Sequence, residues 1–209
     1  MKVAVVCANG RVGRLIVKEA VQRGLDVTAV VREENKTVAQ KAIQKDLFNL
    51  TAADLDSFDV VVDAFGAWAE EELPNHSRSL MHLCDLVSGK QTRLVVVGGA
   101  GSLFINSEHQ AVVSDGADFP PQFLPLAKAQ GKALAELRER KDVQWTFISP
   151  AADFQAEGER TGEYILAGEE LTLNSRGESI ISYADYAIAM VDEITKGNHL
   201  QQRISVVRK

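Results

Sequence analysis

The chain has 209 residues and a net charge of −6 at pH 7, and 45% of its residues are hydrophobic, values ordinary for one globular domain with a sizeable core. A nucleic-acid-binding role is disfavoured, because the sequence has no excess of basic residues to neutralise phosphates. No apolar run approaches the roughly 20 residues that cross a bilayer, and MKVAVV leads into a strand without a signal peptide, so we expect a cytoplasmic protein with no membrane or nucleic-acid partner.

Short β-branched runs alternate with longer amphipathic segments up to residue 149. Strands are predicted at 2–7, 26–31, 42–46, 59–65, 93–99 and 145–149, and helices at 11–24, 75–89 and 124–141. Gly24 is placed to end the first helix, and the capping pair Thr51 and Asp54 opens a shorter helix or turn at 51–56. This alternation predicts an α/β fold with a doubly wound, mostly parallel sheet (a Rossmann fold), in which ligands bind at the carboxyl ends of the strands.

The pattern changes after residue 149. It predicts a hairpin at 162–174, a helix at 182–197 with a capping box of Ser182 and Asp185, and a final strand at 203–207. This tail is too small for a core of its own. We therefore expect a single domain over residues 1–209, in which residues 150–209 form a small C-terminal lobe on the substrate side.

The turn after the first strand has the features of a phosphate-binding turn. Gly10 would allow close backbone approach to a pyrophosphate, and Gly13 would let the helix pack closely against the sheet. Cys7 stands where such turns have their first glycine, and a cysteine is less free in its φ angle. The two glycines alone also fit a simple strand-to-helix turn, so the decision depends on the other strand ends.

Four further strand ends carry residues that suit a dinucleotide. Arg32 follows the second strand, where an arginine favours the 2′-phosphate of NADP, and Arg11 would reach the same phosphate; the adjacent acids Glu33 and Glu34 keep NAD open. Asp46 ends the third strand and would accept from the adenine amino group. The fourth strand ends in DAFGA and the fifth in VVVGGAGSL, both rich in small residues. Together the five strand ends favour a nicotinamide dinucleotide, with NADP preferred over NAD.

The segments CANGRVG, VVREE, VVVDAFGAW, RLVVVGGAGSL, WTFISPAADF and ERTGEYILAGEELTL resemble the atypical short-chain dehydrogenase/reductase group of NAD(P)H-binding proteins, or NADH-flavin reductases. That group is related to flavin/biliverdin-IXβ reductase and to nitrogen-metabolite-repressor-like redox sensors. The resemblance covers nearly the whole chain, and it implies a Rossmann fold, a nicotinamide cofactor and a cytoplasmic location.

The resemblance also assigns roles by position. Ser102 matches the dehydrogenase serine, Lys132 matches the lysine of the Tyr-x-x-x-Lys pair, and Lys128 stands where the tyrosine would be. Pro150 to Phe154 match the loop whose backbone bonds the nicotinamide carboxamide. The cofactor-binding residues predicted from the motifs and the resemblance are Ala8, Asn9, Gly10, Arg11, Val12, Gly13, Arg32, Asp46, Leu47, Ala64, Phe65, Gly66, Gly98, Gly99, Pro150, Ala151, Asp153 and Phe154.

The missing tyrosine bears on the chemistry. Reduction of a ketone needs a proton donor at the developing alkoxide, whereas a flavin or quinone spreads the charge over its ring system. We therefore expect hydride transfer to a small conjugated acceptor, with Ser102, Lys132 and Lys128 as catalytic candidates, by a monomer or homodimer. The alternative is a non-catalytic NAD(P)-binding redox sensor; an epimerase or dehydratase is less favoured because no base is evident. His109 lies in a long loop that would act as a lid, and Trp68 would flank a planar ring.

Overall fold

The computed structural model describes residues 1–209. The strands are β1 (Lys2–Val6), β2 (Asp26–Val31), β3 (Lys41–Gln44), β4 (Val60–Asp63), β5 (Arg93–Val97), β6 (Gln144–Ser149), β7 (Asp153–Gln155), β8 (Tyr164–Ala167), β9 (Ile180–Ser182) and β10 (Gln202–Arg208). The α-helices are α1 (Arg11–Gln22), α2 (Ala52–Leu55), α3 (Asn75–Val87), α4 (Leu124–Arg138) and α5 (Tyr183–Lys196). Single 3-10 turns are η1 (Leu47–Asn49), η2 (Glu70–Glu72), η3 (Val113–Asp115) and η4 (Pro121–Phe123).

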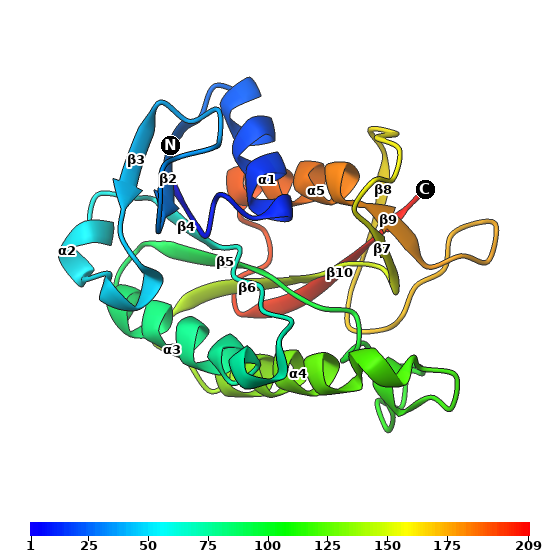
Figure 1. Ribbon diagram of the computed structural model, residues 1–209. Coiled ribbons are helices and arrows are strands. Elements are labelled where there is room, and N and C mark those ends of the chain that lie inside the picture. Colours follow the sequence, from blue (N-terminus) through cyan, green and yellow to red (C-terminus); the bar gives the residue numbers. More distant parts are fainter.

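An eight-stranded sheet in the order β3-β2-β1-β4-β5-β6-β10-β8 forms the centre of the molecule (Figure 1). All neighbouring strands are parallel except β10 and β8, which are antiparallel. Six of the strands follow the 3-2-1-4-5-6 order of the doubly wound fold, and the predicted fold class is confirmed. The parallel strands therefore all end at one edge, which we call the carboxyl edge.

Two helical layers bury the two faces of the sheet (Figure 1). Helices α1 and α5 pack on one face around Ile16, Val17, Tyr186 and Met190, and α3 and α4 pack on the other around Leu80, Leu83 and Leu134. The strands between them are apolar on consecutive positions, as in β4, where Val60, Val61 and Val62 are all buried. Burial on both faces explains this pattern, since alternate residues of a strand meet opposite helical layers.

Several local predictions hold. Helix α1 ends beside Gly24, which has φ 77°, and the amides of Gly24 and Leu25 bond back to Val21 and Ala20. Thr51 and Asp54 form the predicted capping box. At α5 the box is incomplete: Ser182 accepts from the Asp185 amide, but the Asp185 carboxylate accepts from the Thr161 and Gly162 amides. Asp185 thus ties the preceding loop to the helix.

The predicted hairpin at 162–174 is wrong. Its first half forms β8, but β8 pairs with β10, with Ala167 opposite Ser205 and Tyr164 opposite Arg208. The second half leaves the sheet after Ala167 and crosses to the loop after β5, where Leu171 bonds Phe104. The sequence pattern identifies β8 as a strand, but its partner lies about 40 residues away, beyond the reach of local turn signals. None of the helices combines the length and apolar character that a membrane span requires.

Candidate functional site

The turn between β1 and α1 brings the start of the helix close to the end of the strand. Gly10 is the N-cap of α1 and has no side chain to accept from the first amides of the helix, which are left without an intrahelical partner. A Cβ on Gly13 would lie 2.8 Å from the Cys7 carbonyl oxygen and 3.0 Å from that of Ala8. Glycine at these positions therefore gives an uncapped helix start at the carboxyl edge, a geometry that suits an anionic phosphate.

Cys7 adopts the left-handed conformation that the missing glycine would have supplied. Its φ is 59°, an unusual value for a residue with a side chain. The next amide, that of Ala8, bonds the Val30 carbonyl at 3.2 Å and holds the turn to β2. Burial, with a smaller contribution from the Asp63 carboxylate, raises the pKa of the Cys7 thiol to about 12. The thiol is consequently a packing group rather than a nucleophile.

The adenosine side of the edge is organised by Asn9. Its side-chain amide nitrogen donates to the Glu34 carbonyl at 2.9 Å, and its side-chain oxygen accepts from the backbone amide of Lys36 at 2.8 Å. Asn9 thus fixes the loop after β2, where Arg32 is exposed. The Arg11 guanidinium lies 5.8 Å from the Tyr183 ring centroid, at the start of α5. Both predicted phosphate-binding arginines flank the turn.

Asp46 and Leu47 lie where β3 gives way to the single turn η1. The Asp46 carboxylate caps that turn by accepting from the Phe48 amide at 2.9 Å, and it remains half-buried. Leu47 is buried in the layer beneath. One oxygen of Asp46 is therefore committed to the fold, and the other is free to meet a ligand.

The end of β4 lies beside the opening turn. The Ala64 amide bonds the Val6 carbonyl at 3.2 Å, and the next residues are Phe65 and Gly66. A Cβ on Gly66 would meet no atom within 4 Å, so the backbone there faces open space. Trp68 follows on the surface with 62% of its area exposed. The end of β4 therefore leaves open space beside the backbone at Gly66.

Asp63 is the buried acidic residue at this edge. Its carboxylate accepts from the Phe65 amide at 3.0 Å, and burial raises its pKa to about 6. His76 of α3 packs edge-on against Phe65 and bonds the Ala67 carbonyl at 3.1 Å; burial lowers the pKa of His76. Sequence reasoning did not single out Asp63, although an acid at the end of an apolar strand was a visible signal.

The end of β5 is crowded on one side. A Cβ on Gly98 would lie 2.2 Å from the Phe147 ring, and one on Gly99 would lie 2.0 Å from the Gln130 side-chain oxygen. Ser102 follows, half-buried, and its carbonyl accepts from Arg203 at 3.1 Å. The fold therefore requires glycine at 98, where the buried Phe147 ring leaves no space for a Cβ, whereas a side chain at 99 would displace the Gln130 amide.

Helix α4 turns Ala127, Gln130 and Gly131 toward the loop after β5. Lys128 and Lys132 are exposed, and the Lys132 ammonium lies 3.7 Å from the Glu136 carboxylate with 71% of its side chain exposed. Ser102 accepts hydrogen bonds from Arg203, and neither lysine forms a hydrogen bond with it. Gln130, which sequence reasoning missed, is the polar side chain that the helix presents to the edge.

The segment after β6 starts with Pro150 and Ala151, both buried, and continues into β7. The amides of Ala152 and Asp153 bond Ser179, and the Phe154 ring packs 4.1 Å from Tyr183, between centroids. This segment closes the far end of the carboxyl edge. His109 stacks on Phe104 at 4.1 Å and contacts Glu170 at 2.7 Å, so the long loop is held against the segment after β8.

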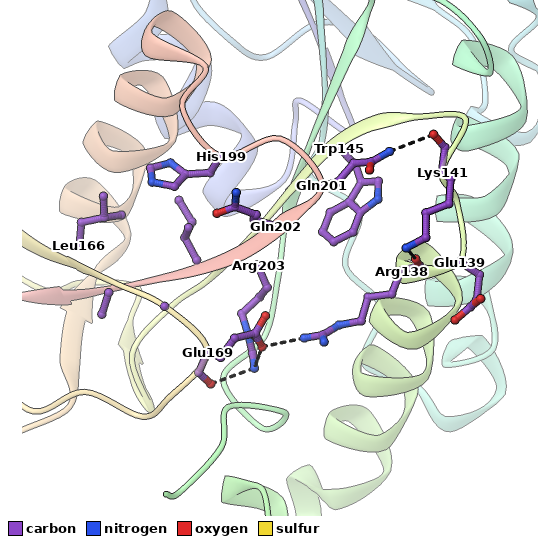
Figure 2. Close-up of a pocket in the computed structure, with 13 residues that line it drawn as sticks. Arg138, Glu139, Lys141, Trp145, Leu166, Glu169, His199, Gln201, Gln202 and Arg203 are labelled. Atoms are coloured by element: carbon purple, nitrogen blue, oxygen red, sulfur yellow. Dashed lines mark hydrogen bonds and ion pairs between the residues drawn. The ribbon is translucent and has the colours of Figure 1, made fainter. Parts of the chain in front are cut away.

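A groove lies away from the carboxyl edge. It has a volume of about 790 Å³ and runs between the end of α4 and the starts of β6 and β10 (Figure 2). Figure 2 shows Arg203 and Arg138 converging on Glu169, with Gln201 bonded to the Lys141 carbonyl. None of the predicted site residues lines the groove. The structure assembles no group of three or more His, Cys, Asp or Glu side chains that could hold a metal.

Comparison with known proteins agrees with this geometry. Residues 7–196 match the family described as NAD(P)H-binding. YwnB of Bacillus subtilis (strain 168), described as uncharacterized, is 43% identical over 99% of this chain and 98% of its own. The crystal structure of SP1627 from Streptococcus pneumoniae TIGR4, described as a candidate NADH-flavin reductase, is 54% identical over 100% of both chains, with a TM-score of 0.98. ChuY of Escherichia coli O157:H7, an anaerobillin reductase, shares the fold with a TM-score of 0.74 at 15% identity.

Proposed function

Since the chain belongs to the NAD(P)H-binding family, we propose that it is an NAD(P)H-dependent reductase that passes a hydride to a flavin, quinone or similar conjugated acceptor. The observation that carries the proposal is the carboxyl edge itself. An uncapped helix start with glycines at 10 and 13 lies next to the open backbone at Gly66. The free amides at the start of α1, which the close packing at Gly13 holds against the end of β1, fit the pyrophosphate of a dinucleotide.

A bound nicotinamide would supply the hydride and solvent would supply the proton, which together would give the oxidised nicotinamide and the dihydro form of the acceptor. The chain contributes binding and orientation. The turn at 7–13 would hold the phosphates, and the segment at Pro150–Phe154 would lie at the nicotinamide end. No tyrosine of α4 is available to protonate an alkoxide, which favours acceptors that delocalise charge.

The description of SP1627 as a candidate NADH-flavin reductase supports this acceptor class, because the two chains are 54% identical over their whole length. The decisive experiment is steady-state oxidation of NADPH and of NADH with FMN, riboflavin, menadione and biliverdin as separate acceptors. Turnover with at least one acceptor is expected. Failure with all of them would remove the reductase proposal.

We propose NADP as the preferred cofactor, on the basis of the exposed Arg32 after β2. Arg32→Ala should raise the dissociation constant for NADP+ about tenfold and leave that for NAD+ within about twofold. Lys18→Ala removes an equal charge from an exposed position of α1 and serves as the control. Equal losses for both cofactors would contradict the preference.

The second candidate is a redox sensor that binds NAD(P) without turnover. It is favoured by the exposed positions of Lys128 and Lys132 and by the ion pair of Lys132 with Glu136, since no hydrogen bond joins either lysine to Ser102. Tight cofactor binding without turnover, and a partner recovered with only one redox form, would support it. A partner that binds equally with either form would rule it out.

The remaining expectations extend this proposal. The protein would act in the cytoplasm on a small-molecule acceptor, as a monomer or homodimer, with residues 1–209 as one domain and 150–209 as its substrate-side lobe. Sedimentation velocity distinguishes the two oligomeric states. Limited proteolysis tests the single domain, since cleavage near residue 150 followed by separation of stable fragments would contradict it.

A further inference from the structure

Gln130 occupies a special place on α4. Its side-chain oxygen lies 2.0 Å from the point where a Cβ on Gly99 would be, so the amide rests directly on the backbone after β5. The neighbours of Gln130 on the same helix face are Ala127, which packs against Gly101, and Gly131, which lies beside Ser102. On this face Gln130 is the polar side chain, and it is half-buried.

A small cavity connects Gln130 to the buried acid of β4. Its volume is about 20 Å³, and Gln130, Asp63 and His76 contribute its polar lining. That volume is about enough for one water molecule, which needs two to four polar partners. One Asp63 oxygen already accepts from the Phe65 amide, which leaves the other for a water. The cavity therefore permits a water bridge from Asp63 to the Gln130 amide.

We propose that Gln130 is the catalytic residue that contacts the conjugated acceptor, and that Asp63 is a positioning residue that orients the Gln130 amide through one water. The inference rests on the proposed function, since the acceptor is the one named there. The Gln130 N–H group donates to the ring nitrogen or oxygen where negative charge accumulates during hydride transfer. An amide stabilises that charge without losing its proton, so the proton of the reduced acceptor still comes from solvent.

Helix α4 approaches the loop after β5 closely on the face that carries Gln130. A Cβ on Gly101 would lie 2.6 Å from the Ala127 methyl group, and one on Gly131 would lie 3.7 Å from the Ser102 side chain. The Gln130 amide lies against the backbone at Gly99, just after the end of β5. Gly99 and Gln130 then form a matched pair, because any side chain at 99 would displace the amide.

The ionisation of Asp63 offers a second readout. The titratable groups that face Asp63 are Cys7 of the opening turn and His76 and Cys84 of α3, while α4 contributes Gln130. Burial raises the pKa of Asp63 to about 6 and lowers that of His76. A protonated Asp63 donates to the bridging water and an ionised one accepts from it, so the orientation of the amide changes near pH 6.

The test compares Gln130→Leu, which keeps the size and removes the amide, with the parent protein. FMN is the probe, and its binding to the NADP+ complex is followed by quenching of flavin fluorescence, which needs no turnover. We expect the dissociation constant for FMN to rise about tenfold and that for NADP+, measured by calorimetry, to stay within about twofold. Gln22→Leu, an equivalent change at an exposed position of α1, is the control.

Unchanged FMN binding by Gln130→Leu, or no FMN binding by the parent, overturns the inference. Loss of reductase turnover in the parent with every acceptor is a separate result and concerns only the proposed function. Gln130→Glu provides a second folded variant, whose kcat should fall as pH rises because its carboxylate repels the charge on the acceptor. For the positioning role, kcat of the parent should change near pH 6, and Asp63→Asn should abolish that change. A parent profile that is flat there removes the role of Asp63.

Discussion

The Arg203 guanidinium donates to the Ser102 carbonyl at 3.1 Å and to the Glu169 carboxylate, joining β10 to the loop after β5. The Arg203 side chain is completely buried, and its planar group also lies 5.6 Å from the Phe104 ring centroid. Arg138 reaches the same Glu169 oxygen at 2.7 Å from the end of α4 (Figure 2). Two arginines thus bind the same carboxylate, one of them fully buried and the other partly exposed.

Replacement of Arg203 by Met should destabilise the protein by about 3 kcal/mol, because Glu169 loses its buried partner and the Ser102 carbonyl loses a donor. Arg138→Met should cost less than about 1 kcal/mol, since Arg138 is 40% exposed and water replaces its contact. Urea unfolding followed by circular dichroism measures both. An equal loss of stability in the two variants would show that the burial of the arginine does not determine how much its bond to Glu169 contributes.

The turn at the start of α1 makes a second prediction. In Gly13→Ala the new Cβ would meet backbone atoms of Cys7 and Ala8, which cannot move aside, so the helix must shift from the turn. We expect a loss of about 2 kcal/mol in stability and at least a tenfold loss of NADP+ affinity by calorimetry. Gly66→Ala adds the same methyl group to open space and should change stability by less than about 0.5 kcal/mol.

Local elements of this fold were accessible from sequence because their signals are local. The apolar runs of β1, β2 and β4 and the stop at Gly24 follow from burial and turn chemistry. The position of β10 was not accessible. It is last in the chain yet lies between β6 and β8, and β8 gives no local indication that its partner is β10 rather than the next segment.

The orientation of α4 shows a different limit. The family resemblance assigns Lys128 and Lys132 as the site residues of α4. In the structure, the buried residues Ala127, Leu134 and Leu137 instead define a helix face that includes position 130. Alanine and glycine give weak contrast in a hydrophobic pattern, so the face is hard to recognise from the sequence. Which residues the helix offers to the edge becomes clear only when Gly99 and Gly101 are seen against it.

Cys7 yields a prediction that reverses the usual order of substitutions. At its φ of 59° glycine is free of strain, whereas alanine is not, so Cys7→Gly should be more stable than Cys7→Ala by about 1 kcal/mol. Cys84 is the control, because it is the other cysteine of the chain and lies buried inside α3 with helical backbone. At that position the free energy of unfolding of Cys84→Ala should be about 1 kcal/mol higher than that of Cys84→Gly, as measured by urea unfolding. The same order at both sites would contradict a left-handed Cys7.

The last prediction concerns the pH dependence of stability. The pKa of Asp63 is about 6 in the folded protein against 3.8 ordinarily, because the carboxylate is buried. The folded state therefore prefers the protonated acid, and this stabilisation is complete below about pH 3.8 and lost as pH rises through 6. Asp63→Asn removes the ionisation. Its stability relative to the parent should improve by up to about 3 kcal/mol between pH 4 and pH 8.

Asp26 provides the control of opposite sign for that experiment. A hydrogen bond from Lys41 lowers the pKa of its exposed carboxylate, so Asp26 stabilises the fold at neutral pH and loses this effect as the solution becomes acidic. By urea unfolding, Asp26→Asn should therefore be less stable than the parent from pH 8 down to pH 4, and it should approach the parent only as the pH falls below 3.8. If both variants shifted in the same direction, a general effect of net charge would explain the data, and Asp63 would not be the buried acid that the structure describes.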